Sequence, residues 1–147
     1  MRINAYTDYS LRVLIHAAAI YPQRTTVQEV ADAYGISKNH LMKVINELGR
    51  GGYIETQRGR AGGFALSRPP ERIKVGEVVR FAEKDNVLVE CFDAISNKCV
   101  ITPACKLKFH LHEAIQAFYA SLDRYTVADL YDKPEAILRH LGLPASK

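Results

Sequence analysis

No hydrophobic run in the sequence approaches the roughly 18 apolar residues that are needed to cross a bilayer. The first residues, MRINAYTDYS, lack the charged segment, long apolar core and small-residue cleavage site of a secretory signal. We therefore expect a cytoplasmic protein without a membrane partner, in which thiols stay reduced.

Catalytic signatures are also missing. The chain has no nucleotide-binding glycine motif and no grouping of Ser, His and Asp in a plausible catalytic context. We therefore expect that the protein is not an enzyme.

Cysteine is scarce but clustered, because Cys91, Cys99 and Cys105 fall within fifteen residues and the chain has no others. An odd number of cysteines in a reducing compartment argues against disulfides and leaves metal binding, a reactive thiol or plain burial. Seven and five residues separate the three, unlike the C-x-x-C pairs of many zinc and redox sites. This spacing favours an iron–sulfur cluster, whose usual fourth ligand must come from a different residue, a small molecule or another chain.

Positive charge is concentrated in the first half of the chain. Residues 1–72 contain ten Lys and Arg against six Asp and Glu, whereas residues 73–147 contain ten of each kind. This imbalance favours a nucleic-acid-binding face in the first half, although an ordinary solvated surface would also account for it.

The first half is expected to contain three helices. Thr7 is a suitable N-cap for a helix to about Tyr21, with an apolar stripe of Leu11, Leu14, Ile15 and Ala18. Thr26 and Glu29 form a capping box that opens a second helix, and Gly35 ends it. A third helix follows with the buried stripe Leu41, Val44, Ile45 and Leu48. A short helix, a glycine turn and a capped helix together indicate a helix-turn-helix.

The third helix carries polar residues near its N-terminus, away from its apolar stripe: Ser37 as the cap, then Lys38, Asn39, His40 and Lys43. A recognition helix presents such residues to base edges and phosphates in the major groove of double-stranded DNA. Taken alone, the same pattern would also suit a helical hairpin with a polar outer face.

A β-hairpin is predicted directly after this helix. The segments YIETQ and FALS are rich in strand-forming residues and flank the glycine-rich turn RGRAGG. The turn would project Arg58 and Arg60 from a narrow tip, and inserted arginine is favoured in the DNA minor groove. Its position behind a helix-turn-helix makes the hairpin a candidate wing.

The second half is predicted to hold a fourth helix in KVGEVVRFAE, an irregular loop from residue 84 to about 102, and a long helix beginning near Pro103. Short helices are expected after Thr126 and over residues 134–141. The long helix has an apolar stripe of Leu107, Leu111, Ile115, Phe118 and Leu122, which suits dimerisation or an ordinary core.

The predicted fold is therefore mainly α with a small β-hairpin wing, forming one compact domain. Residues 1–72 would form the winged helix-turn-helix region, and residues 73–147 the cluster-binding loop and the dimerisation helices.

Several segments resemble the winged-helix iron–sulfur transcriptional regulators of the Rrf class. These are TDYSLRVL, the stretch from VADAYGISKNHL to RAGGFAL, ECFD, NKCVITPAC and YTVADL, which together extend over nearly the whole chain. The two cysteine-bearing segments are the most specific, and they point to the nitric-oxide-sensing repressors of that class.

The resemblance implies a homodimer that binds a palindromic operator and represses genes of nitrosative stress. It also implies a cluster, usually 4Fe-4S, held by Cys91, Cys99 and Cys105, with Asp8 from the other subunit as the fourth ligand. Asp8 also suits an ordinary role, because it can pair with Arg12 one helical turn later.

One departure separates the chain from relatives that govern cluster biosynthesis. Those proteins place a ligating histidine three residues after the third cysteine, where this chain has Lys108, and we do not expect His110 or His112 to replace it. Other members sense iron status with the same three thiolates, so iron and redox sensing remain alternatives to nitric oxide. An electron-transfer iron–sulfur protein and a winged helix with structural zinc are the alternatives from other classes.

Overall fold

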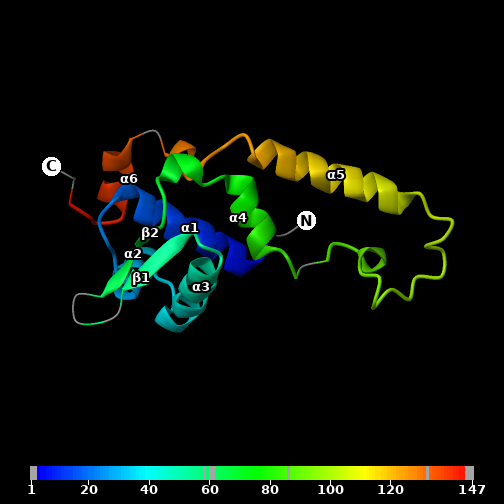
Figure 1. Ribbon diagram of the computed structural model, residues 1–147, viewed down its shortest axis with the longest axis horizontal. Coiled ribbons are helices and arrows are strands. Elements are labelled where there is room, and N and C mark those ends of the chain that lie inside the picture. The colour runs from blue at the N-terminus through cyan, green and yellow to red at the C-terminus, as the bar shows by residue number, and fades with distance from the viewer. Residues whose placement is uncertain (1–2, 58, 60–61, 86, 132, 145–147) are drawn as a thin grey trace.

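The computed structural model describes residues 3–57, 59, 62–85, 87–131 and 133–144 (Figure 1). The α-helices are α1 (Ala5–Ala19), α2 (Val27–Tyr34), α3 (Lys38–Arg50), α4 (Val75–Ala82), α5 (Leu107–Leu122) and α6 (Pro134–His140). Strands β1 (Ile54–Gln57) and β2 (Gly63–Leu66) form an antiparallel hairpin. Short 3-10 helices lie at η1 (Pro70–Arg72), η2 (Glu90–Phe92) and η3 (Val127–Leu130). The predicted class, mainly α with a hairpin wing, is confirmed.

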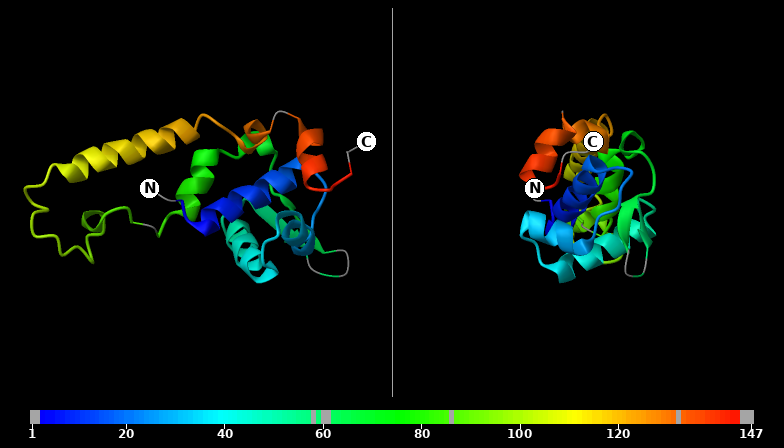
Figure 2. Two further views of the ribbon diagram at one scale, coloured as in Figure 1. Left: turned by 180° about the vertical axis from the view of Figure 1, so that it is seen from behind. Right: turned by 90° about the vertical axis from the view of Figure 1, so that its left-hand side faces the viewer.

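The chain forms a body and an arm. The arm consists of the cysteine loop, residues 84–106, and α5, and it extends away from the body in Figure 1 and in the left-hand view of Figure 2. The body contains the other helices and the hairpin. Among the described residues, no helix combines the length and the apolar content that a bilayer crossing requires.

The body is built on one hydrophobic core to which both halves of the chain contribute. Residues from α1, α3 and β2 lie at its centre, and Ile73, Val78 and Val127 complete it from the second half. The predicted stripe of α3 is buried in full: Leu41, Val44, Ile45 and Leu48 are each less than 5% exposed. Its period of three and four residues therefore predicted the buried face correctly.

The start of α1 differs from the prediction, because its N-cap is Asn4 and not Thr7. The Asn4 side-chain oxygen accepts a hydrogen bond from the Thr7 amide at 2.7 Å. Thr7 lies inside the first turn and is fully buried. Both residue types cap helices well, so tertiary burial decides between them.

Helix α2 agrees with the sequence pattern in full, and α3 agrees with it in part. Thr26 and Glu29 form the capping box of α2, and Gly35 ends this helix with a left-handed φ of 62°. Ser37 occupies the N-cap position of α3, but its side chain makes no capping hydrogen bond.

The hairpin is fixed to the body by a third segment. Thr25, just before α2, exchanges two backbone hydrogen bonds with Phe64 of β2, at 2.8 and 2.9 Å. Phe64, Ala65 and Leu66 of β2 are buried, whereas only Ile54 is buried in β1. Strand β2 is therefore bonded to the body through Thr25, whereas most of β1 is exposed to solvent.

The arm lacks a core within the described chain, since no residue of α5 is buried. The helix begins at Leu107, so the predicted start near Pro103 is wrong. Turns occupy the intervening residues, where the amides of Thr102 and Ala104 bond to the carbonyls of Cys99 and Ile101. Of the predicted apolar stripe of α5, Leu107 is exposed, and the remaining members are half-buried.

His16 of α1 is a fully buried histidine in the body. Its Nε2 lies 3.1 Å from the Thr25 hydroxyl, which donates to the Glu29 carboxylate at 2.9 Å. Its Nδ1 has no hydrogen-bond partner among the described residues. Burial lowers the pKa of His16, and the nearby Glu29 carboxylate opposes that shift only in part.

This burial predicts a stability that depends on pH. The unfolded chain binds a proton at His16 more readily than the folded chain, so the free energy of unfolding should fall as pH drops below about 6.5. One proton contributes at most about 1.4 kcal/mol per pH unit. Urea unfolding of the reduced protein between pH 7.5 and 5 measures this slope. The variant His16→Leu should flatten it, and an equal slope in both proteins would contradict the assignment.

Candidate functional site

The exposed face of α3 presents the residues predicted to meet DNA. All five are exposed: Ser37, Lys38, Asn39, His40 and Lys43. Asn39 and Lys43 lie on the side of the helix opposite its buried stripe. The first-turn amides of a helix lack intrahelical partners and carry partial positive charge, which favours a phosphate at this end. The face therefore combines cationic side chains with hydrogen-bonding groups suited to bases.

A hollow beside this face shows residues that the sequence analysis missed. It measures about 380 Å³ and lies between α3 and the hairpin, lined in part by Met42, Asn46, Thr56 and Gln57. Asn46 lies one helical turn beyond Lys43 and is exposed. This spacing on the same helix face is the signal that could have identified Asn46.

The predicted wing arginines, Arg58 and Arg60, lie outside the described residues. The strands on either side are described, with β1 ending at Gln57 and β2 beginning at Gly63. The register pairs Gln57 with Gly63, which is the last described pair of the hairpin.

The three cysteines all belong to the arm loop, where they are free thiols. Cys91 belongs to η2 and is half-buried, Cys99 is exposed, and Cys105 is half-buried just before α5. Local hydrogen bonds shape the loop between them. Asp93 accepts bonds from the Ser96 hydroxyl and the Ile95 amide, which lower the pKa of its carboxyl. The Cys99 amide donates to the Asn97 side chain at 3.1 Å.

The donor set of this loop fits an iron–sulfur cluster held by three thiolates. Within the described part of the chain, no three His, Cys, Asp or Glu side chains are close enough together to hold a single metal ion. Three soft sulfur donors on one loop suit iron and sulfide better than a hard cation. A four-iron cluster on these thiolates would need one further ligand from outside the loop.

Asp8 lies in the first turn of α1 and is paired within its own chain. Its carboxylate bonds to the Arg12 guanidinium at 2.8 and 3.1 Å. The Asp8 side chain is 47% exposed, so solvent or another chain can still reach it. Asp8 also borders an open hollow of about 490 Å³ lined by Ile3, Ala5, Tyr9 and Leu11.

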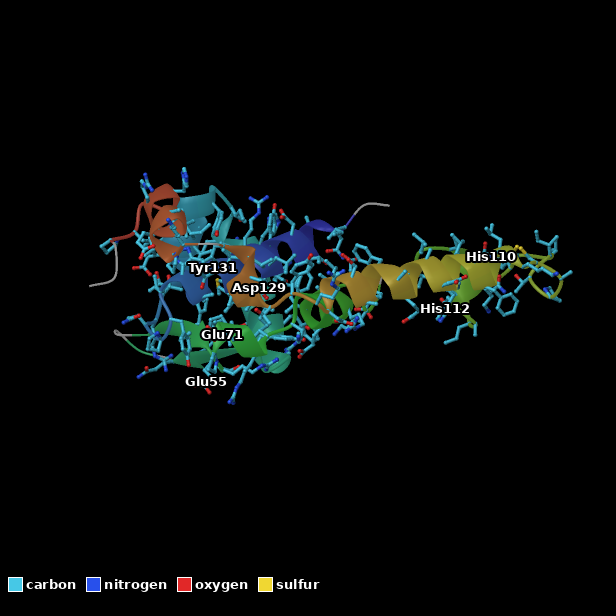
Figure 3. All side chains as sticks on the ribbon, turned by 90° about the horizontal axis from the view of Figure 1, so that it is seen from above. Glu55, Glu71, His110, His112, Asp129 and Tyr131 are labelled. Carbon is cyan, nitrogen blue, oxygen red and sulfur yellow. The ribbon has the colours of Figure 1, made fainter. Side chains whose placement is uncertain are left out.

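The two histidines after the cysteines do not act as a pair. His110 and His112 lie on opposite sides of α5 (Figure 3). The His112 ring meets Phe92 edge-on, with 6.3 Å between ring centroids. They therefore cannot converge on one ion from this helix.

The comparison with protein families identifies one match. The model of the Rrf2 family, described as an iron-dependent transcriptional regulator, matches residues 3–133. The HTH-type transcriptional regulator NsrR of Bacillus subtilis is 54% identical over 144 residues, covering 97% of this chain and 99% of that protein. The NsrR protein of Geobacillus kaustophilus is 49% identical, covering 96% of each chain.

Solved structures show the same fold at lower identity. The oxidized form of CymR from Staphylococcus aureus matches with a TM-score of 0.69 and 22% identity, covering 90% of this chain and 98% of that one. IscR from T. potens matches with a TM-score of 0.68 and 21% identity, covering 88% and 85% of the two chains.

The exposed lysine at position 43 provides a test of the DNA-binding face. Lys43→Ala should weaken operator binding and reduce the slope of log affinity against log salt by about 1, because one phosphate contact is lost. Titrations at several salt concentrations measure the slope. The matched control is Lys133→Ala, an exposed lysine before α6, which should leave the slope unchanged. Equal slopes for wild type and Lys43→Ala would place Lys43 away from DNA.

Proposed function

Because the chain belongs to the Rrf2 family of transcriptional regulators, we propose that it is a homodimeric repressor whose operator binding depends on an iron–sulfur cluster sensitive to nitric oxide. The chain has no fourth cysteine to bind the cluster, which is expected to be of the 4Fe-4S kind. The protein acts in the cytoplasm, where its operator DNA lies. Residues 1–72 serve DNA binding, and residues 73–147 serve the cluster and dimerisation.

The observation that carries this proposal is the position of the three free thiols. They lie on an arm that is outside the hydrophobic core, so they are not needed to build the body. Cysteine packed for stability would be buried in the core, as free cysteine commonly is. Thiols gathered on an outlying loop instead suit a ligand set for a signal-responsive group.

The DNA side of the proposal uses the exposed face of α3 and the hairpin. Asn39 can pair with adenine in the major groove, and Lys38 and Lys43 can bind guanine or phosphate. His40 and the Ser37 hydroxyl add hydrogen-bonding groups at the same end of α3. Arg58 and Arg60 are proposed to enter the minor groove from the wing.

Dimerisation is supported by the exposed apolar side chains at the start of α5. Leu107 is 58% exposed and Phe109 is 70% exposed, which is costly for apolar side chains in a lone subunit. A second copy of α5 would cover this face. Dimeric helix-turn-helix proteins must then present their recognition helices about 34 Å apart, one turn of DNA, or a multiple of that distance.

The cluster ligands are proposed to come from both subunits. Cys91, Cys99 and Cys105 would hold the cluster, and Asp8 of the partner subunit would complete it. Arg12 holds the Asp8 carboxylate in a fixed direction through two bonds, so the ligand is preorganised. A carboxylate is a harder ligand than a thiolate, which makes this fourth position the weakest of the set.

The bound group would supply iron that reacts with nitric oxide. The chain's own part is mechanical: three thiolates hold the loop, and the weak Asp8 contact ties it to the opposite subunit. When these ligands are released, the arm is no longer held across the dimer. A coupling of about 1 to 3 kcal/mol would then weaken operator binding about 5- to 150-fold.

Iron status is the second candidate signal, because the matching family model is described as iron-dependent. The two signals give different results. A nitric oxide sensor loses operator binding when nitric oxide is added at constant iron. An iron sensor loses operator binding when a chelator lowers the free iron in the absence of nitric oxide.

Replacement of a cysteine tests the cluster. After anaerobic purification, Cys99→Ala should lack the visible absorbance of the wild type and show no nitric oxide response in operator titrations. Its thermal midpoint without cluster should match that of the cluster-free wild type, because Cys99 is exposed. The neighbouring control Val100→Ala, at a residue 90% exposed, should keep both properties. A wild-type preparation without iron and sulfide would sink the proposal.

Replacement of Asp8 tests the fourth ligand. Asp8→Ala should speed cluster loss to a chelator by at least about tenfold, the size of effect known even for partners outside the ligand shell. Asp8→Cys provides a softer ligand and should retain the cluster. Asp32→Ala removes an exposed carboxylate from α2 and serves as the control. Equal loss rates for Asp8→Ala and wild type would exclude Asp8 as a ligand.

A further inference from the structure

Both roots of the arm are attached to helix α4. The cysteine loop begins directly after the α4 C-cap, Glu83. The far end of α5 returns to the same helix, where Arg80 bonds to Asp123 at 2.6 Å and lies over the Tyr119 ring. Gly76 of α4 approaches Asp123 so closely that an added Cβ would lie 2.1 Å from its carboxylate. A displacement of the arm therefore acts on α4.

One end of α4 is held against the start of α1. The Glu83 carboxylate accepts a hydrogen bond from the Asn4 amide at 3.1 Å and another from the Thr7 hydroxyl. Asn4 is the N-cap of α1, and Thr7 is buried. This contact restrains the C-terminal end of α4, so movement of the arm tends to turn the helix about it.

A second contact joins α4 to the DNA-binding elements. Phe81 packs edge-to-face against Tyr53, with 5.3 Å between ring centroids. Gly51, the C-cap of α3, lies so close that an added Cβ would be 2.8 Å from the Phe81 ring and 2.9 Å from the Tyr53 ring. The end of the recognition helix thus meets α4 with no room for a side chain between them.

Tyr53 connects this contact to both DNA-binding elements. Its amide donates to the Leu48 carbonyl of α3 at 3.0 Å, and its carbonyl accepts from the Ser67 amide just after β2 at 3.0 Å. Arg68 lies over the Tyr53 ring and bonds to Glu77 of α4 at 3.0 Å. A shift of Phe81 is therefore transmitted to the recognition helix and to the base of the wing.

We propose that the contact of Phe81 with Gly51 and Tyr53 is the joint through which the arm sets the position of the recognition helix and the wing. Phe81 and Gly51 are positioning residues, since neither is placed to touch DNA or the cluster. This inference rests on the proposed cluster-dependent repression. It adds the route by which the state of the cysteine loop reaches the operator.

Two substitutions perturb the joint from its two sides. Phe81→Leu removes the ring atom nearest Gly51, and Gly51→Ala inserts a methyl group into the same contact. The double variant restores space for that methyl group. The matched control is Gly49→Ala, two residues earlier in α3, where an added Cβ meets nothing within 4 Å.

The measured quantity is the ratio of operator Kd without cluster to operator Kd with cluster, in the full-length dimer. We expect each single variant to lower this ratio by about 2- to 30-fold, the range found for residues that carry coupling between sites. Absorbance should show the same cluster content as wild type. Gly49→Ala should keep the wild-type ratio.

A second readout needs no cluster. In the cluster-free protein, each single variant should lower the free energy of unfolding. The double variant should lose less than the sum of these two losses, because the substitutions compensate at one contact. Hydrogen exchange at the Tyr53 amide should rise in Phe81→Leu.

The outcomes separate the two proposals. If cluster loading leaves the wild-type Kd unchanged, the proposed function fails. If the wild type responds and Phe81→Leu keeps the full ratio, the joint is refuted while the proposed function stands. Additive free-energy losses would also overturn the joint. Should Gly51→Ala fail to fold, the ratio for Phe81→Leu still decides.

Discussion

A single hydrophobic core holds α3, the hairpin and α4 in one body, while α5 of the arm has no buried residue. This asymmetry governs the rest of the structure. The core that contains Leu14, Leu41, Phe64 and Val78 includes no residue of the arm. The arm must gain its order from outside, through a second subunit or a bound group. A segment with few buried contacts is also the part of a protein most easily reordered by a ligand.

Local signals in the sequence predicted the body well. The stripe of α3, the capping box of Thr26 and Glu29 and the left-handed Gly35 each follow from residues within one or two turns. The predicted start of α1 is wrong, because Asn4 and Thr7 are both residue types that cap helices well. Thr7 is instead buried against the end of α4. The predicted start of α5 is wrong because a proline is compatible with the first turn of a helix but does not make a helix begin there.

The candidate site was only partly accessible to such reasoning. The cysteine spacing and the exposed residues of α3 can be found in the sequence, since each set is local. The contact between Gly51 and Phe81 joins residues thirty positions apart, and nothing in either segment indicates it. The hollow with Asn46 and Thr56 likewise forms only when α3 and β1 are folded together. Short-period sequence patterns therefore cannot predict contacts between residues that are far apart in the chain.

The attachment of the arm to one helix has an evolutionary consequence. Because the arm starts directly after the α4 C-cap and its far end is bonded to Arg80 of α4, the length and ligands of the intervening loop can change without disturbing the core that supports α3. Descendants of one ancestral scaffold can then acquire different chemical inputs while their operators stay the same. The chemical input and the choice of promoter could then evolve independently of each other.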